Sequence, residues 1–122
     1  MTPFQRCLLR TAADAAGLPD GPLGDISTDT GCREQEYVLA RNLAVCLLVY
    51  AGIHEYGAAA LIPNHMGFHK IKGSARPPHF LLQGMHDYAS KMYCGEEIND
   101  LEVELLQIHT ERWFDSIKPI KC

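Results

Sequence analysis

Histidine pairs give the first candidates for chemistry in this chain of 122 residues. His65 and His69 are four residues apart, so on a helix both imidazoles would point the same way. Two imidazoles on one face supply half of a tetrahedral zinc site, which makes these residues the candidates for a metal. His54-Glu55 does not begin a zinc-protease motif, because position 58 is Ala. Apart from that pair, we expect no metal and no cofactor.

Basic residues gather in the same part of the chain, although its formal net charge is −4. Residues 63–92 carry four cationic side chains and one carboxylate, a balance of +3, together with four of the six histidines. A local basic stripe is typical of a surface that binds phosphates. The residues predicted to contact nucleic acid are Lys70, Lys72, Arg76, His65, His69 and His79.

Residues 96–115 have the opposite charge, with a balance of −6. Glu97, Glu104 and Glu111 recur every seven residues, which predicts one acidic helix face. Such a face suits a basic protein partner, although on ordinary amphipathic grounds it is more typical of a solvated outer surface. Trp113 and Phe114 are adjacent and cannot both point inward, so one of the two rings is expected to be an exposed anchor, and Trp113 is the one assigned to this protein interface.

Motifs of covalent catalysis are absent from the sequence. It has no Gly-x-Ser-x-Gly motif and no Gly-rich phosphate loop, and its five cysteines include no Cys-x-x-Cys pair. We therefore expect a protein that is not an enzyme, with reduced thiols. The longest apolar stretch, Leu43 to Ile53, has eleven residues, whereas a membrane span needs about 20. With no secretory signal at the N-terminus, we expect a cytoplasmic protein.

Helix signals dominate the segments that must position these residues. Thr2-Pro3-Phe4-Gln5 predicts a capping box at the start of a helix that Gly17 ends. Apolar spacing predicts further helices over residues 32–51, 54–61, 64–70 and 78–93. Asn99 caps the last helix, whose expected buried side comprises Leu101, Leu105, Leu106, Ile108, Trp113 and Ile117.

No run of alternating apolar and polar residues predicts a strand. The sequence thus predicts an all-α fold, a compact bundle of five or six helices that forms a single domain over residues 1–122.

One stretch, from Arg33 to Leu48, resembles the long helix of a known DNA-binding domain, the C-terminal domain of the bacterial replication initiator DnaA. That family carries an Ala-Arg-Gln-Ile-Ala-x-x-Leu pattern, and residues 40–47 read Ala-Arg-Asn-Leu-Ala-Val-Cys-Leu. The likeness in helix order extends in outline over residues 33–92. It implies a centre like a helix-turn-helix and binding to duplex DNA.

Three functions stay open on the sequence alone. The first is a small regulatory protein that binds nucleic acid through the basic, His-rich centre. The second is an inhibitor or adaptor that binds a protein through the acidic face, like the anti-CRISPR proteins that phages use against host defence. The third is a helical bundle that binds zinc or a small ligand. The expected partner is nucleic acid or a nucleic-acid-binding protein, and a homo-oligomer is compatible with this sequence.

Overall fold

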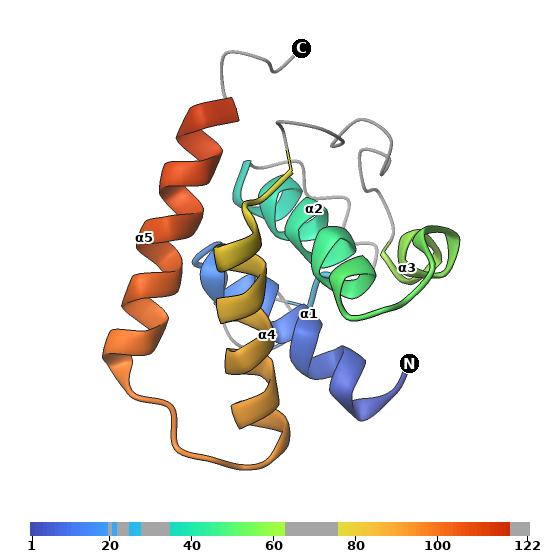
Figure 1. The fold of residues 1–122 in the computed structure, drawn as a ribbon, viewed down its shortest axis with the longest axis horizontal. Helices are drawn as coiled ribbons and strands as arrows, with labels where there is room; N and C mark the ends of the chain where they lie inside the picture. The colour runs from blue at the N-terminus through green and yellow to red at the C-terminus, as the bar shows by residue number, and fades with distance from the viewer. Residues whose placement is uncertain (20, 22–24, 28–34, 63–75, 118–122) are drawn as a thin grey trace.

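The computed structural model describes residues 1–19, 21, 25–27, 35–62 and 76–117, which form five α-helices and no β-strand (Figure 1). This confirms the predicted all-α bundle. The predicted helix over residues 64–70, and with it the centre like a helix-turn-helix, lies outside the described residues. The helices are α1 (Pro3–Ala15), α2 (Gln35–Tyr50), α3 (Glu55–Leu61), α4 (His79–Tyr93) and α5 (Asp100–Ile117).

Helix α1 begins and ends at the signals in its sequence. The Thr2 hydroxyl accepts a hydrogen bond from the Gln5 amide at 3.1 Å, and the Gln5 side chain accepts one from the Thr2 amide at 3.0 Å. At the other end Gly17 has a φ of +80°, a left-handed conformation that glycine adopts readily. This turn lets the Leu18 amide donate to the Ala13 carbonyl at 2.9 Å, and the predicted helix end is thereby confirmed.

Helix α2 forms the centre of the core. Every residue from Leu39 to Leu48 is buried, including the polar residues Arg41 and Asn42. Its second half is apolar on all sides, which predicts a helix surrounded by others, and contacts from α1, α3 and α4 confirm this prediction. No helix in the described ranges combines the length and the apolar character that crossing a membrane requires.

Helices α1, α4 and α5 meet at Asp14. The Tyr88 hydroxyl on α4 donates to Asp14 Oδ2 at 3.0 Å, and the Arg10 guanidinium pairs with Asp14 Oδ1 at 2.7 Å. From α5, the Gln107 side-chain amide donates to the Asp14 backbone carbonyl at 3.1 Å. These contacts hold the last turn of α1 between α4 and α5.

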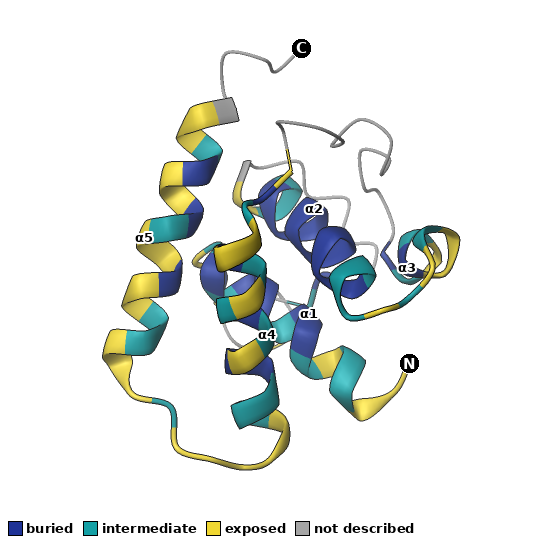
Figure 2. Ribbon diagram, viewed as in Figure 1, coloured by how far each residue is buried: buried dark blue, intermediate teal, exposed yellow. Residues whose placement is uncertain are grey.

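Helix α5 covers one side of the bundle, across from α3 (Figure 1). It begins after Asn99, whose side-chain oxygen accepts a hydrogen bond from the Glu102 amide at 2.9 Å, as its capping sequence predicts. It packs on α1 and α4 along a narrow side where Leu106, Thr110 and Trp113 are buried. Figure 2 shows buried positions on the side toward the other helices and exposed positions along much of the rest.

Candidate functional site

The predicted basic surface falls largely outside the described residues. Arg76 and His79 are described, and both are exposed where the chain enters α4. Nucleic-acid binding by this segment therefore stays a prediction. The four other predicted contacts all lie within residues 63–75, which the structure does not describe: His65, His69, Lys70 and Lys72.

Arg76 and His79 lie against the end of α2. Arg76 lines a small cavity of about 120 Å³ together with Cys46 and Tyr50. The His79 ring packs edge-on against the Tyr50 ring, with 5.5 Å between their centroids. Burial raises the pKa of the Cys46 thiol to about 12, although the nearby Arg76 guanidinium lowers it. At neutral pH Cys46 is thus a protonated core residue and a poor nucleophile.

Lys91, the remaining cation of the basic segment, lies at the far end of α4. Its ammonium group pairs with the Glu102 carboxylate on α5 at 3.0 Å. It lies fifteen positions after Arg76 in the sequence, and most of the residues between them are helical. Because an α-helix rises about 1.5 Å per residue, the two cations are about 20 Å apart along the chain direction. Arg76 and Lys91 therefore do not form one basic patch.

Metal-binding side chains do not assemble in the part of the chain that the structure describes. Within it, no three His, Cys, Asp or Glu residues lie close enough together to hold an ion. The zinc candidates His65 and His69 lie outside it. Another histidine of the basic segment, His86, packs between the rings of Phe4 and Tyr50, at centroid distances of 5.5 and 5.9 Å.

The outer face of α5 corrects the predicted buried side of this helix. Leu101, Leu105 and Ile108 are 60%, 45% and 37% exposed. Apolar residues occupy both sides of α5, and only the side with Leu106 and Trp113 faces α1 and α4. The three exposed residues are spaced by four and three, so they are neighbours along the helix surface. We refer to Leu101, Leu105 and Ile108 as the apolar stripe.

Acidic side chains flank the apolar stripe. Glu104 and Glu111 are exposed on α5, and each is a neighbour of Ile108 on the helix surface, at spacings of four and three. Glu97 is also exposed but precedes the first residue of α5. The prediction that all three share one helix face is therefore wrong for Glu97.

Trp113 is part of the core, which confirms its place on the predicted buried side of α5 and corrects its predicted role as an interface anchor. It is 5% exposed and belongs to the main cluster of buried apolar residues. The neighbouring Phe114 is half-buried and packs at the edge of that cluster. Their adjacency required one of the two rings to leave the core, and the structure shows that it is Phe114.

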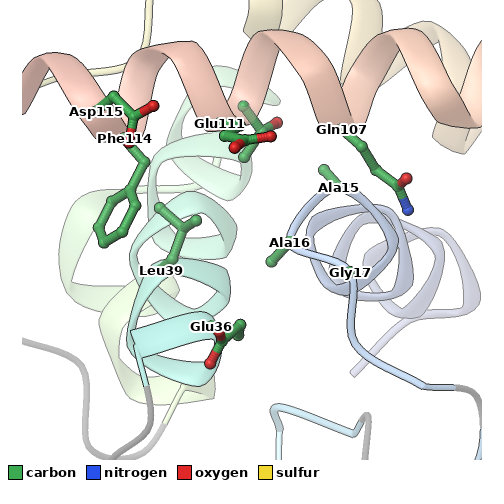
Figure 3. Close-up of a pocket in the computed structure, with 10 residues that line it drawn as sticks. Ala15, Ala16, Gly17, Glu36, Leu39, Gln107, Glu111, Phe114 and Asp115 are labelled. Atoms are coloured by element: carbon green, nitrogen blue, oxygen red, sulfur yellow. The ribbon is translucent and has the colours of Figure 1, made fainter.

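A cleft of about 340 Å³ lies between α5 and the ends of α1 and α2 (Figure 3). Its charged wall residues are carboxylates, with Glu36 in the first turn of α2 and Glu111 and Asp115 on α5. Leu39 and Phe114 contribute apolar walls, and Figure 3 shows the Phe114 ring extending from α5 toward α2. We refer to this feature as the acidic cleft.

Thr110 adds a buried polar group to the wall of the acidic cleft. It is 1% exposed, and its hydroxyl has no hydrogen-bond partner among the described residues. An unsatisfied buried hydroxyl costs about 1–3 kcal/mol. No sequence pattern marks this site, because its walls come from three segments that are far apart in the chain.

No protein-family model matches this chain, and no curated protein or solved structure matches it. The resemblance of residues 33–48 to the DnaA helix therefore stays a prediction. The residues that carry its motif, 40–47, are all buried in α2, so in this fold they pack the core.

Proposed function

We propose that this protein binds another protein through the outer face of α5 and acts on that partner as an inhibitor or adaptor. The observation that carries the proposal is the apolar stripe, Leu101, Leu105 and Ile108, exposed on a helix whose charged residues are mostly acidic, with Arg112 as its one cation among the described residues. Amphipathic helices that dock into grooves use anchors at this spacing. Exposed apolar residues in a continuous line are typical of interaction surfaces.

The charges around the apolar stripe favour a basic partner. Glu104 and Glu111 lie beside it, and residues 96–115 carry a balance of −6. Complementary charges accelerate association and fix the orientation of two surfaces. A second copy of this chain would bring the same carboxylates to the contact, so charge repulsion disfavours a dimer through α5. The partner expected here has an apolar groove bordered by lysine or arginine.

The described cations give less support to a nucleic-acid partner. A protein that binds a duplex places several cationic side chains along one surface. Lys91 is paired with Glu102, while Arg76 borders α2 at the other end of α4. The carboxylates of α5 would in addition repel the phosphate backbone. These observations favour a protein partner for the surface that the structure describes.

Site-specific photo-crosslinking tests the proposal in cells that produce the protein. A photoreactive phenylalanine replaces Leu105 on α5, and in a matched control it replaces Tyr56, which is exposed on α3. We expect the probe at position 105 to form a crosslink to one partner, which mass spectrometry identifies, and the probe at position 56 to form none. The same partner crosslinked equally from both positions would overturn the proposal, as would crosslinks to nucleic acid alone.

A further inference from the structure

We propose that the docking surface extends from α5 onto α4, with Phe80 as a second anchor, and that it fits an apolar groove bordered by lysine or arginine on both sides. This inference rests on the proposed function and adds to it a second helix and a second charged border. The two helices run antiparallel and lie side by side, joined by residues 94–99 (Figure 1).

Phe80 on α4 continues the apolar stripe of α5. Its ring is 59% exposed and packs edge-on against the His109 ring, with 5.3 Å between the centroids. Leu101, Leu105 and His109 are spaced by four residues each, so they follow one line along α5. The apolar surface therefore passes from the stripe through His109 to Phe80.

The contact with His109 orders the Phe80 ring before a partner binds. An aromatic side chain that is exposed and already packed on one edge loses little conformational freedom when its free face is covered. Aromatic rings of this kind are enriched among the few residues that carry most of the binding energy of an interface. His109 is thus a positioning residue, and Phe80 is the anchor.

Contacts between α4 and α5 define how far the shared surface extends. At its centre, a Cβ added to Gly84 would lie 3.7 Å from the Leu106 side chain. At the end opposite Phe80, Lys91 pairs with Glu102 at 3.0 Å. Phe80 and Lys91 are eleven residues apart, so the surface is about 16 Å long, or three helical turns.

Carboxylates border this surface on both sides. On α4, Asp87 is exposed, is three residues from Gly84 and forms no ion pair with a described residue. On α5, Glu104 and Glu111 lie on the side of the apolar stripe that is turned away from His109, because each residue advances by about 100° round a helix. A groove with cations on both of its borders would meet both sets of carboxylates.

The cations of the surface lie near its ends. Lys91 is paired with Glu102 near the loop that joins the helices, and Arg112 is exposed four residues after Ile108. The long sides therefore stay acidic. A second copy of this chain would place carboxylates against carboxylates there, and a nucleic acid would place phosphates against them. The occupant that fits is a basic protein surface with an apolar centre.

Photo-crosslinking from α4 tests whether this helix belongs to the docking surface. A photoreactive phenylalanine replaces Phe80, and in a matched control it replaces Tyr93. Tyr93 is on the same helix, is 55% exposed and also packs edge-on against a ring, that of Phe4. We expect position 80 to capture the same protein as position 105, and position 93 to capture none.

Substitutions then test the anchor and the second charged border through the yield of the crosslink from position 105. F80A should lower this yield at least about fivefold, as expected for the loss of an anchor. D87K should lower it about threefold, because a cation would then face the basic border of the groove. The matched controls, Y93A and E55K, should leave it unchanged, since E55K alters the net charge equally but on α3. Circular dichroism reports whether each variant keeps its helices.

Three results would overturn the proposal. The first is a partner captured from position 105 but not from position 80, and the second is an unchanged yield in F80A. The third is a yield in D87K equal to that in E55K. Each differs from failure of the proposed function, in which position 105 captures no protein. Capture from position 80 alone would show that α4 binds without α5, which contradicts a shared surface.

Discussion

Helices α2 and α5 are similar in length, at 16 and 18 residues, but the bundle uses them in opposite ways. α2 buries ten consecutive residues, 39–48, because α1, α3 and α4 surround it. α5 contacts α1 and α4 along one side and leaves the apolar stripe exposed. The difference shows that the burial of an apolar residue depends on how many neighbours its helix has. An apolar residue in α2 therefore contributes to stability, whereas one on the outer face of α5 is available for binding.

The largest expected effect breaks the core at α2. Leu47 is fully buried, and L47A should lower the free energy of unfolding by about 2–5 kcal/mol. The matched change on α5, L105A, should alter it by about 0.5 kcal/mol or less, because Leu105 is exposed. Denaturant unfolding followed by circular dichroism measures both. A loss of similar size in the two variants would contradict the distinction between the helices.

A smaller effect is expected at Thr110, where a buried side of α5 carries a hydroxyl without a partner among the described residues. T110V removes that hydroxyl and keeps the shape of the side chain, so it should raise the free energy of unfolding by about 1 kcal/mol. The control is T11V on α1, because the Thr11 hydroxyl donates to the Cys7 carbonyl at 2.7 Å. T11V should lower the free energy of unfolding by about 1 kcal/mol. A decrease of similar size in T110V would show that the Thr110 hydroxyl is hydrogen-bonded in solution.

The smallest expected effect concerns pH and Cys46 in α2. Burial raises the pKa of this thiol from its ordinary value of 9.0 to about 12. As the pH rises, the thiol therefore ionises first in the unfolded chain. Its contribution to the free energy of unfolding is complete below pH 9 and is lost as the pH rises toward 12. Relative to C46A, the native protein should lose about 1 kcal/mol of unfolding free energy between about pH 8 and 10. A difference between the two proteins that stays constant with pH would show that Cys46 is accessible to solvent.

Local signals were sufficient to predict the helix ends. Thr2, Gly17 and Asn99 act on backbone groups within a few residues, so their effect is written in the neighbouring sequence. The burial of α2 was equally predictable, because residues that are apolar on every side of a helix require neighbours on every side.

The functional face of α5 could not be predicted in the same way. Leu101 and Leu106 are both apolar positions of one helix, and only the placement of α1 and α4 decides which of them is covered. The acidic cleft depends on that placement as well, since Glu36 and Glu111 are distant in the sequence and meet at the same opening. Adjacency showed that Trp113 and Phe114 diverge, but not which ring is buried.

The affinity of the crosslinked partner for two variants tests the central claim most directly. Isothermal titration compares the native protein with L105D on the apolar stripe and with Y56D on α3, where Tyr56 is 78% exposed. We predict that L105D raises the Kd at least about tenfold, because a charge replaces an apolar anchor, and that Y56D leaves it unchanged. Equal affinities of L105D and the native protein would contradict the assignment of α5 as the docking surface.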